Sequence, residues 1–367
     1  MLLSRSDGDE PVAAVEIEPC RGLLADASRQ CLTRRFGQVI GDRDDPRPAV
    51  AAIEAAVRGE GGFVLSSCHG VMHTVGRKYA ADRGLDLSDL QDVLPRSNDP
   101  GCSAGFAHGL VTGVAPTIDV RRPGEVGEVC EEAGTRYQRY SCVHGLGHAF
   151  MRLHGDRLQP ALRLCTALGE PAPDCAQGAY HDYWFAVVGA DEATLPGAAV
   201  RDPRALCAAQ QERFVRACWY RAFVDDRPAG IVVDSPEHFE VLCRDLAGLQ
   251  RRACVTAVSV IGPPDPAQQL RLCALLDTPA DAESCVRGTK AQNLLSEPPA
   301  ALVDLIGRCE LFAGATRAAC YRWLGKTIAV VTNGAFAESG CPQLTPNGER
   351  LCRDGAASMD AALVTFS

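Results

Sequence analysis

FEVLCRDLAGLQRRACVTAVSV, residues 239–260, carries two cysteines with ten residues between them. The apolar segments at its two ends predict helices, and the polar segment between them predicts a bend. A turn midway between Cys243 and Cys254 would place their side chains opposite each other across an antiparallel helix pair. This stretch therefore predicts a helical hairpin that is closed by a disulfide.

The same arrangement recurs along the chain. Paired cysteines with nine to eleven residues between them appear eight times. The second cysteine of each pair, with Cys68 and Cys102 added, returns about every 36 residues, a period typical of solenoids. Glycine and proline lie between the units, as at residues 261–264 and 296–299. We therefore predict an all-α fold, an α-solenoid of about ten helix-hairpin repeats.

The cysteine spacing also predicts a disulfide pattern. Cys68 and Cys102 have no partner at the hairpin spacing, so we expect them to bond to each other between neighbouring units. Each local bridge would contribute about 3 kcal/mol through loop entropy. The alternative is free cysteines in the core. The predicted pairs are Cys20–Cys31, Cys68–Cys102, Cys130–Cys142, Cys165–Cys175, Cys207–Cys218, Cys243–Cys254, Cys273–Cys285, Cys309–Cys320 and Cys341–Cys352.

Composition indicates the compartment. Eighteen cysteines in 367 residues favour an oxidising environment, so we expect a secreted, periplasmic or cell-surface protein. The first residues, Met1–Asp7, lack the apolar segment of a signal peptide, so we expect that a leader or anchor has been removed or that translation starts upstream. We expect no membrane span, because no apolar run approaches 18 residues. A net charge of −9 without a basic run argues against a nucleic-acid partner.

The chain divides by its chemistry into three predicted parts. Residues 1–15 are expected to be a disordered N-terminal segment, and residues 16–195 to be helical repeats that bear most of the histidines. Residues 196–367 carry no recognisable chemical motif, and we expect them to be scaffold or a partner surface.

Tetratricopeptide-type solenoids resemble this layout, and the cysteine-rich Sel-type helical repeats resemble it most. Sel-type repeats also carry one disulfide in each helix pair. The resemblance covers roughly Cys20 to Ala362 and concerns only the period and the placement of cysteines. The ten-residue gap between cysteines is longer than expected for that group. The resemblance therefore implies an architecture and no functional residues.

Six of the eight histidines form a pattern that occurs twice. Residues 69–77 and 144–152 both read H-G-x-x-H-x-x-x-R, and each is followed one unit later by C-x-x-G-x-x-H. Two histidines at i and i+4 share a helix face and can bind one metal ion, and a third from the adjacent helix completes three nitrogens. The predicted metal ligands are His69, His73, His108, His144, His148 and His181.

Six imidazoles without an obvious acidic ligand suit copper, or alternatively zinc. The pattern of H-x-x-x-H plus a distant histidine, present twice, is similar to the type-3 copper sites of haemocyanins and tyrosinases in its ligands only. That likeness implies binding or activation of dioxygen if two coppers lie about 4 Å apart. If the two sets of three histidines lie apart, two mononuclear sites are expected. The alternative is a set of histidines that serve only packing.

Other residues near the histidines are candidates for supporting roles. Asp182 is a candidate ligand, orienting group or general base. Arg77, Arg152 and Tyr180 are candidates for the outer shell of the metal or for the pocket wall. Glycines inside the predicted helices permit close approach of either a ligand or another helix. These glycines are Gly70, Gly105, Gly145, Gly147 and Gly178.

Three hypotheses about the function follow from these patterns. The first is an exported metalloenzyme, either a copper-dependent oxidase or dioxygen-binding protein or a zinc-dependent hydrolase. The second is a non-catalytic solenoid that holds a protein, peptide, glycan or small molecule on its concave face. The third is a metal carrier or store. Metal analysis of untagged protein separates the second hypothesis from the other two.

Overall fold

A computed structural model describes residues 12, 14–99, 101–189, 202–225, 232–263, 265–289 and 299–358. The regular structure of these residues is helical, and they contain no strand, which confirms the all-α class. By its internal contacts the chain divides into two compact units, Met1–Ile118 and Asp119–Ser367. The predicted boundary at residue 195, like most of the predicted N-terminal segment 1–15, lies outside the described residues.

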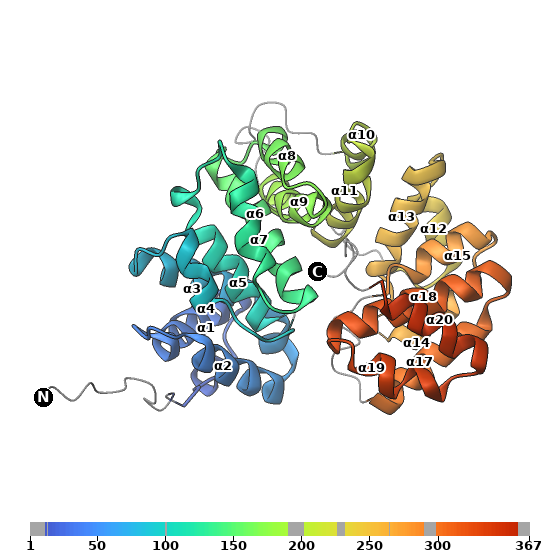
Figure 1. Ribbon diagram of the computed structural model, residues 1–367, viewed down its shortest axis with the longest axis horizontal. Coiled ribbons are helices and arrows are strands. Elements are labelled where there is room, and N and C mark those ends of the chain that lie inside the picture. Colours follow the sequence, from blue (N-terminus) through green and yellow to red (C-terminus); the bar gives the residue numbers. More distant parts are fainter. Residues whose placement is uncertain are drawn as a thin grey trace, which may run out of the picture. The chain divides into compact units, whose positions relative to one another are not determined.

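The first unit, which Figure 1 shows in blue to teal, contains the helices that carry His69, His73 and His108. Helix α1 (Ala25–Ile40) packs on α3 (Gly62–Asp82), and α3 packs far more extensively on α5 (Cys102–Gly113). The helices of this unit are α1 (Ala25–Ile40), α2 (Arg47–Glu60), α3 (Gly62–Asp82), α4 (Leu90–Val93) and α5 (Cys102–Gly113).

The second unit is a longer array of helix pairs. Its helices are α6 (Pro123–Glu131), α7 (Arg136–Leu153), α8 (Leu158–Ala167), α9 (Ala172–Gly189), α10 (Pro203–Ala208), α11 (Glu212–Asp225), α12 (Pro236–Leu242), α13 (Gly248–Val260), α14 (Pro266–Cys273), α15 (Pro279–Val286), α17 (Pro299–Gly307), α18 (Gly314–Val331), α19 (Ala335–Ser339) and α20 (Pro346–Ala356).

Consecutive pairs stack through their second helices. Helix α7 packs on α9, α9 on α11, α11 on α13, α13 on α15, and α15 on α18. The array also curves, because α18 comes back into contact with α7. Within each unit, neighbouring helices along the chain are therefore neighbours in space, as expected for a solenoid.

Proline and polar capping residues fix where the short helices begin. Pro266 starts α14 directly after Asp265, whose side chain accepts a hydrogen bond from the helix backbone. Pro279 starts α15 after Thr278 in the same way. Proline has no backbone N–H to leave unsatisfied in the first turn, and its fixed φ suits a helix start. Both helices have eight residues and would be marginally stable alone, so these fixed start positions help to determine where they form.

All nine predicted disulfides are present, and no cysteine is free. Eight bridges close hairpins, and Cys68–Cys102 joins α3 to α5 with a Cα–Cα distance of 5.0 Å. Disulfides in this number fit an oxidising compartment. The chain is a disulfide-stapled helical-repeat protein.

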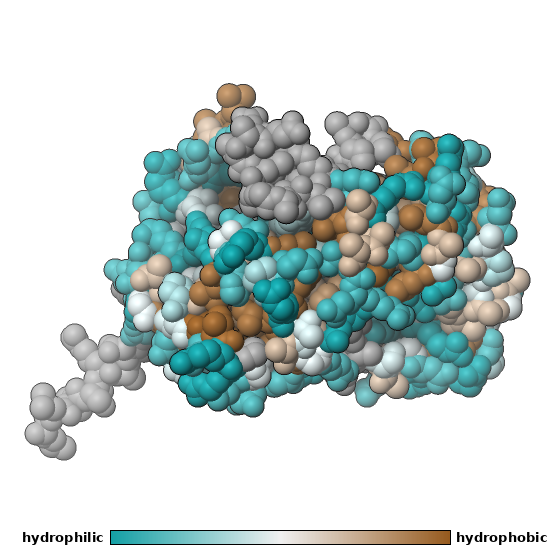
Figure 2. Space-filling view, turned by 90° about the horizontal axis from the view of Figure 1, so that it is seen from above, coloured by the Kyte–Doolittle hydropathy of each residue, from teal (hydrophilic) through white to brown (hydrophobic). Residues whose placement is uncertain are grey.

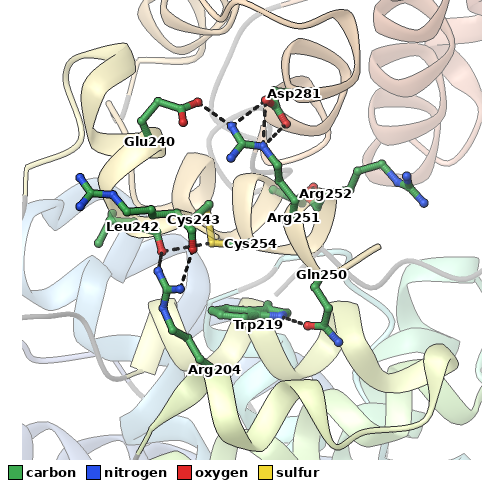
Figure 3. The surroundings of a disulfide bond; sticks show 12 residues. Arg204, Trp219, Glu240, Leu242, Cys243, Gln250, Arg251, Arg252, Cys254 and Asp281 are labelled. Atoms are coloured by element: carbon green, nitrogen blue, oxygen red, sulfur yellow. Dashed lines mark hydrogen bonds and ion pairs between the residues drawn. A yellow bond between two sulfur atoms is a disulfide. The ribbon is translucent and has the colours of Figure 1, made fainter. Parts of the chain in front are cut away.

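Polar contacts reinforce the hairpins. Beside the Cys243–Cys254 bridge, Arg204 of the preceding pair donates to the carbonyl oxygen of Leu242 (3.0 Å), as Figure 3 shows, and also to that of Arg244 (2.6 Å). Leu242 is the last residue of α12 and Arg244 lies just beyond it, where backbone acceptors lack helical partners. A side chain from one pair thus caps the first helix of the next.

The surface is mainly hydrophilic in the view of Figure 2, with smaller hydrophobic areas between the polar ones. Several large apolar side chains are exposed in the first unit, namely Leu23, Leu24, Phe63 and Leu65. In the described part of the chain, none of the helices has the length and apolar character required to cross a membrane.

Candidate metal centre

The first set of histidines, His69, His73 and His108, lies where α3 packs on α5. One ligand nitrogen from each ring lies within 4.8 Å of the other two. The ring centroids are 5.0–5.4 Å apart, and His108 Nδ1 lies 3.2 Å from His73 Nε2. His108 is buried, whereas His69 and His73 are partly exposed. The set is therefore preassembled and reachable from solvent.

Glycines bring these rings together. A Cβ on Gly105 would lie 2.2 Å from the carbonyl oxygen of His69, and one on Gly109 would lie 2.3 Å from that of His73. Helices α3 and α5 therefore touch backbone to backbone at the two histidines of α3. Only glycine permits this approach, and it places His108 against both other rings.

The second set, His144, His148 and His181, is built in the same way between α7 and α9. A Cβ on Gly178 would lie 2.0 Å from the carbonyl oxygen of His144. A Cβ on Gly147 would lie 2.0 Å from the carbonyl oxygen of Cys175 on the facing helix. The ring centroids are 4.9 Å apart for His144 and His148, 5.1 Å for His148 and His181, and 6.1 Å for His144 and His181. The second set is wider than the first along one edge.

A buried arginine contacts the second set. Arg221 of α11 is 4% exposed, and its Nη2 lies 3.4 Å from both His144 Nε2 and Gln177 Oε1. Gln177 Oε1 also accepts a hydrogen bond from Tyr140 at 2.8 Å. The guanidinium donates toward Nε2 of His144, one of the two nitrogens through which that ring could bind a metal, and its fixed charge opposes a second cation. The two sets are therefore chemically different.

Asp182 takes an orienting position. Its Oδ1 accepts a hydrogen bond from Nδ1 of His148 at 2.8 Å, and its side chain is 32% exposed. A carboxylate on Nδ1 fixes the tautomer and leaves Nε2 as the acceptor or ligand atom. Of the three roles considered for Asp182, this contact matches the orienting one.

The remaining candidates are placed without a defined role. Arg77 and Arg152 are exposed on α3 and α7, and Tyr180 is fully buried on α9. Burial raises the pKa of the Tyr180 phenol well above its usual value, so the group stays protonated. Outer-shell roles for these three residues stay predictions.

Four of the five candidate glycines, all except Gly145, divide into two kinds by their surroundings. Gly105, Gly147 and Gly178 serve contact between helices, as described above. Gly70 is different, because a Cβ added there would meet no atom within 4 Å. Helix packing therefore explains the first three and leaves Gly70 without a packing reason.

Two buried cations are not predictable from a motif, because residues 196–367 contain no recognisable one. They are Arg221 and Lys326, and Lys326 is 9% exposed. Burial, with a smaller contribution from Arg136, lowers the pKa of Lys326 to about 8. Lys326 comes six residues after Cys320, the position that His148 holds relative to Cys142. This repeat position could have identified Lys326, whereas no comparable signal marks Arg221.

The comparisons with known proteins gave no similarity to report: no family model matches the chain, and no curated protein or solved structure is significantly similar to it.

Proposed function

We propose that this is an exported metal-binding protein that holds one transition-metal ion through His69, His73 and His108. The observation that carries the proposal is that three imidazole nitrogens from two helices lie within 4.8 Å of one another. A tetrahedral site with metal–nitrogen distances of about 2.0–2.1 Å needs ligand nitrogens about 3.3 Å apart. The His73–His108 pair is already at 3.2 Å, so small ring rotations suffice for the third.

The donor set favours copper, with zinc as the alternative. All three donors are imidazoles, which suit both metals better than calcium or magnesium. Three protein nitrogens leave a coordination position open for water or a small molecule. Such a site is compatible with a copper carrier, a dioxygen-binding or oxidase centre, or a zinc-dependent hydrolase. We also propose that the repeats are of the Sel type and that the protein is secreted.

The contact between Arg221 and His144 favours one metal for each chain. To bind at Nε2 of His144, a metal would have to displace a nearly buried guanidinium. The coupled dicopper centre suggested by the histidine pattern requires metal in both sets, so the structure gives it less support than a mononuclear site. A non-catalytic binding module remains the alternative from another functional class.

The test is a titration of untagged, chelator-treated protein with Cu²⁺ or Zn²⁺, followed by calorimetry and elemental analysis. We expect one ion per wild-type chain and, for copper, a mononuclear paramagnetic spectrum. In Arg221→Gln the guanidinium charge is lost, so we expect a second ion to bind. Wild-type protein that binds no metal would refute the proposed function. Two ions in the wild type would refute only the role given to Arg221.

A further inference from the structure

A cavity of about 770 Å³ lies between α1 and α3 in the first unit. Its size is within the range of small-molecule sites. Ile40, Val71 and Val75 contribute apolar surface to its wall. The described lining residues do not include His69, His73 or His108, so the cavity is separate from the metal site.

Two helix-interior glycines keep the cavity open. Gly37 of α1 and Gly70 of α3 both line it, and a Cβ added at either position would meet no atom within 4 Å. Glycine weakens a helix interior relative to alanine. At Gly105 and Gly109 that weakness is explained by backbone contact between helices, but at Gly37 and Gly70 no such contact exists. Glycine at these two positions therefore adds space to the cavity and serves no contact between helices.

The rim of the cavity is positively charged although the chain is acidic overall. Four cationic side chains and two carboxylates line the cavity, namely Arg29, Arg34, Lys78, Arg83, Asp42 and Asp82.

The charges on this rim are available to a ligand. Lys78 pairs with Asp82 at 2.5 Å, and Arg83 pairs with Asp44, but both pairs are at the surface, where such contacts are weak and exchangeable. Within the described residues, Arg34 is exposed and makes no ion pair. An incoming anion would therefore find one arginine without an ion pair and neighbours able to reorient toward it.

We infer that this cavity binds a small amphipathic carboxylate, whose apolar body lies along Gly37 and Gly70 and whose charged head lies at Arg34. The apolar wall fits a hydrocarbon chain, and the positive rim selects an anion over a cation of the same shape. This site is independent of the proposed metal function.

The test uses three probes with the chelator-treated full chain, measured by calorimetry. Dodecanoate carries both features, dodecyltrimethylammonium has the same body with the opposite charge, and propionate has the charge without the body. We expect one dodecanoate per chain, bound at least 10-fold more tightly than either other probe. Equal binding of dodecyltrimethylammonium or of propionate would overturn the inference.

Variants locate the binding. Gly37→Leu fills the cavity from α1, so dodecanoate affinity should fall at least 10-fold while the melting temperature is not lowered. Arg34→Glu should lower the affinity about 10-fold and leave dodecyltrimethylammonium unaffected or bound more tightly. If Gly37→Leu fails to fold, Gly70→Leu fills the same space from α3. Unchanged dodecanoate affinity in a folded cavity-filling variant would contradict the assignment.

Discussion

Replacing His108 with alanine should weaken binding of Cu²⁺ or Zn²⁺ about 100-fold or more, because even the loss of an outer-shell partner costs 10- to 100-fold. His108 is the single contribution of α5 to the first set, and it lies beside both rings of α3. Without it, two nitrogens on one helix face remain, which do not close a three-nitrogen site. Calorimetric titration of the two proteins under identical conditions measures the difference.

The control is His238→Ala, since His238 lies on α12 in the second unit and belongs to neither set. Its affinity should equal that of the wild type. If His108→Ala binds metal as tightly as the wild type, then the ion is held elsewhere and the first set is a packing feature. A lower affinity in both variants would point to nonspecific histidine binding.

Gly109→Ala should destabilise the first unit by about 3 kcal/mol, the upper end of the range for overpacked cores. The added Cβ would lie 2.3 Å from the carbonyl oxygen of His73 and 2.8 Å from the backbone nitrogen of Arg77. Backbone atoms cannot rotate away as a side chain can, so α3 and α5 would have to separate. Because separation moves His108 from His73, metal affinity should fall as well. Urea unfolding, with metal titration of the folded fraction, measures both effects.

The matched control is Gly70→Ala on α3. Its Cβ would meet no atom within 4 Å, so helix propensity alone applies and predicts a gain of up to about 1 kcal/mol. The two substitutions are chemically identical and differ only in what surrounds them. Equal stability of Gly109→Ala and Gly70→Ala would contradict the close backbone contact.

Much of the fold is predictable because its units are local. A bend between Cys243 and Cys254 suffices to predict one hairpin, and the regular return of this spacing predicts the array. Even the nonlocal Cys68–Cys102 bridge followed from the two cysteines left without hairpin partners. The division after Ile118 was not predictable. The cysteine spacing continues from Cys102 to Cys142 without a break that would mark it.

The site was predictable where it follows the repeat and unpredictable where it depends on curvature. His148 and His181 each come six residues after their cysteines, so the repeat places them on matching helix faces. Arg221 reaches His144 through the packing of α11 on α9, which is a contact between repeats and not within one. The sequence also could not decide what the glycines serve. Gly178 lies against the backbone of a neighbouring helix, whereas no atom lies within 4 Å of a Cβ added at Gly70.

The proposed metal centre consists of three imidazoles from α3 and α5 that together bind one metal ion. Anomalous diffraction from crystals of the wild-type protein, collected on both sides of the copper or zinc absorption edge after loading, locates the ion directly. We expect one strong peak about 2 Å from a nitrogen of each of His69, His73 and His108. Loaded crystals with no peak between these rings, or with their principal peak at other side chains, would contradict it.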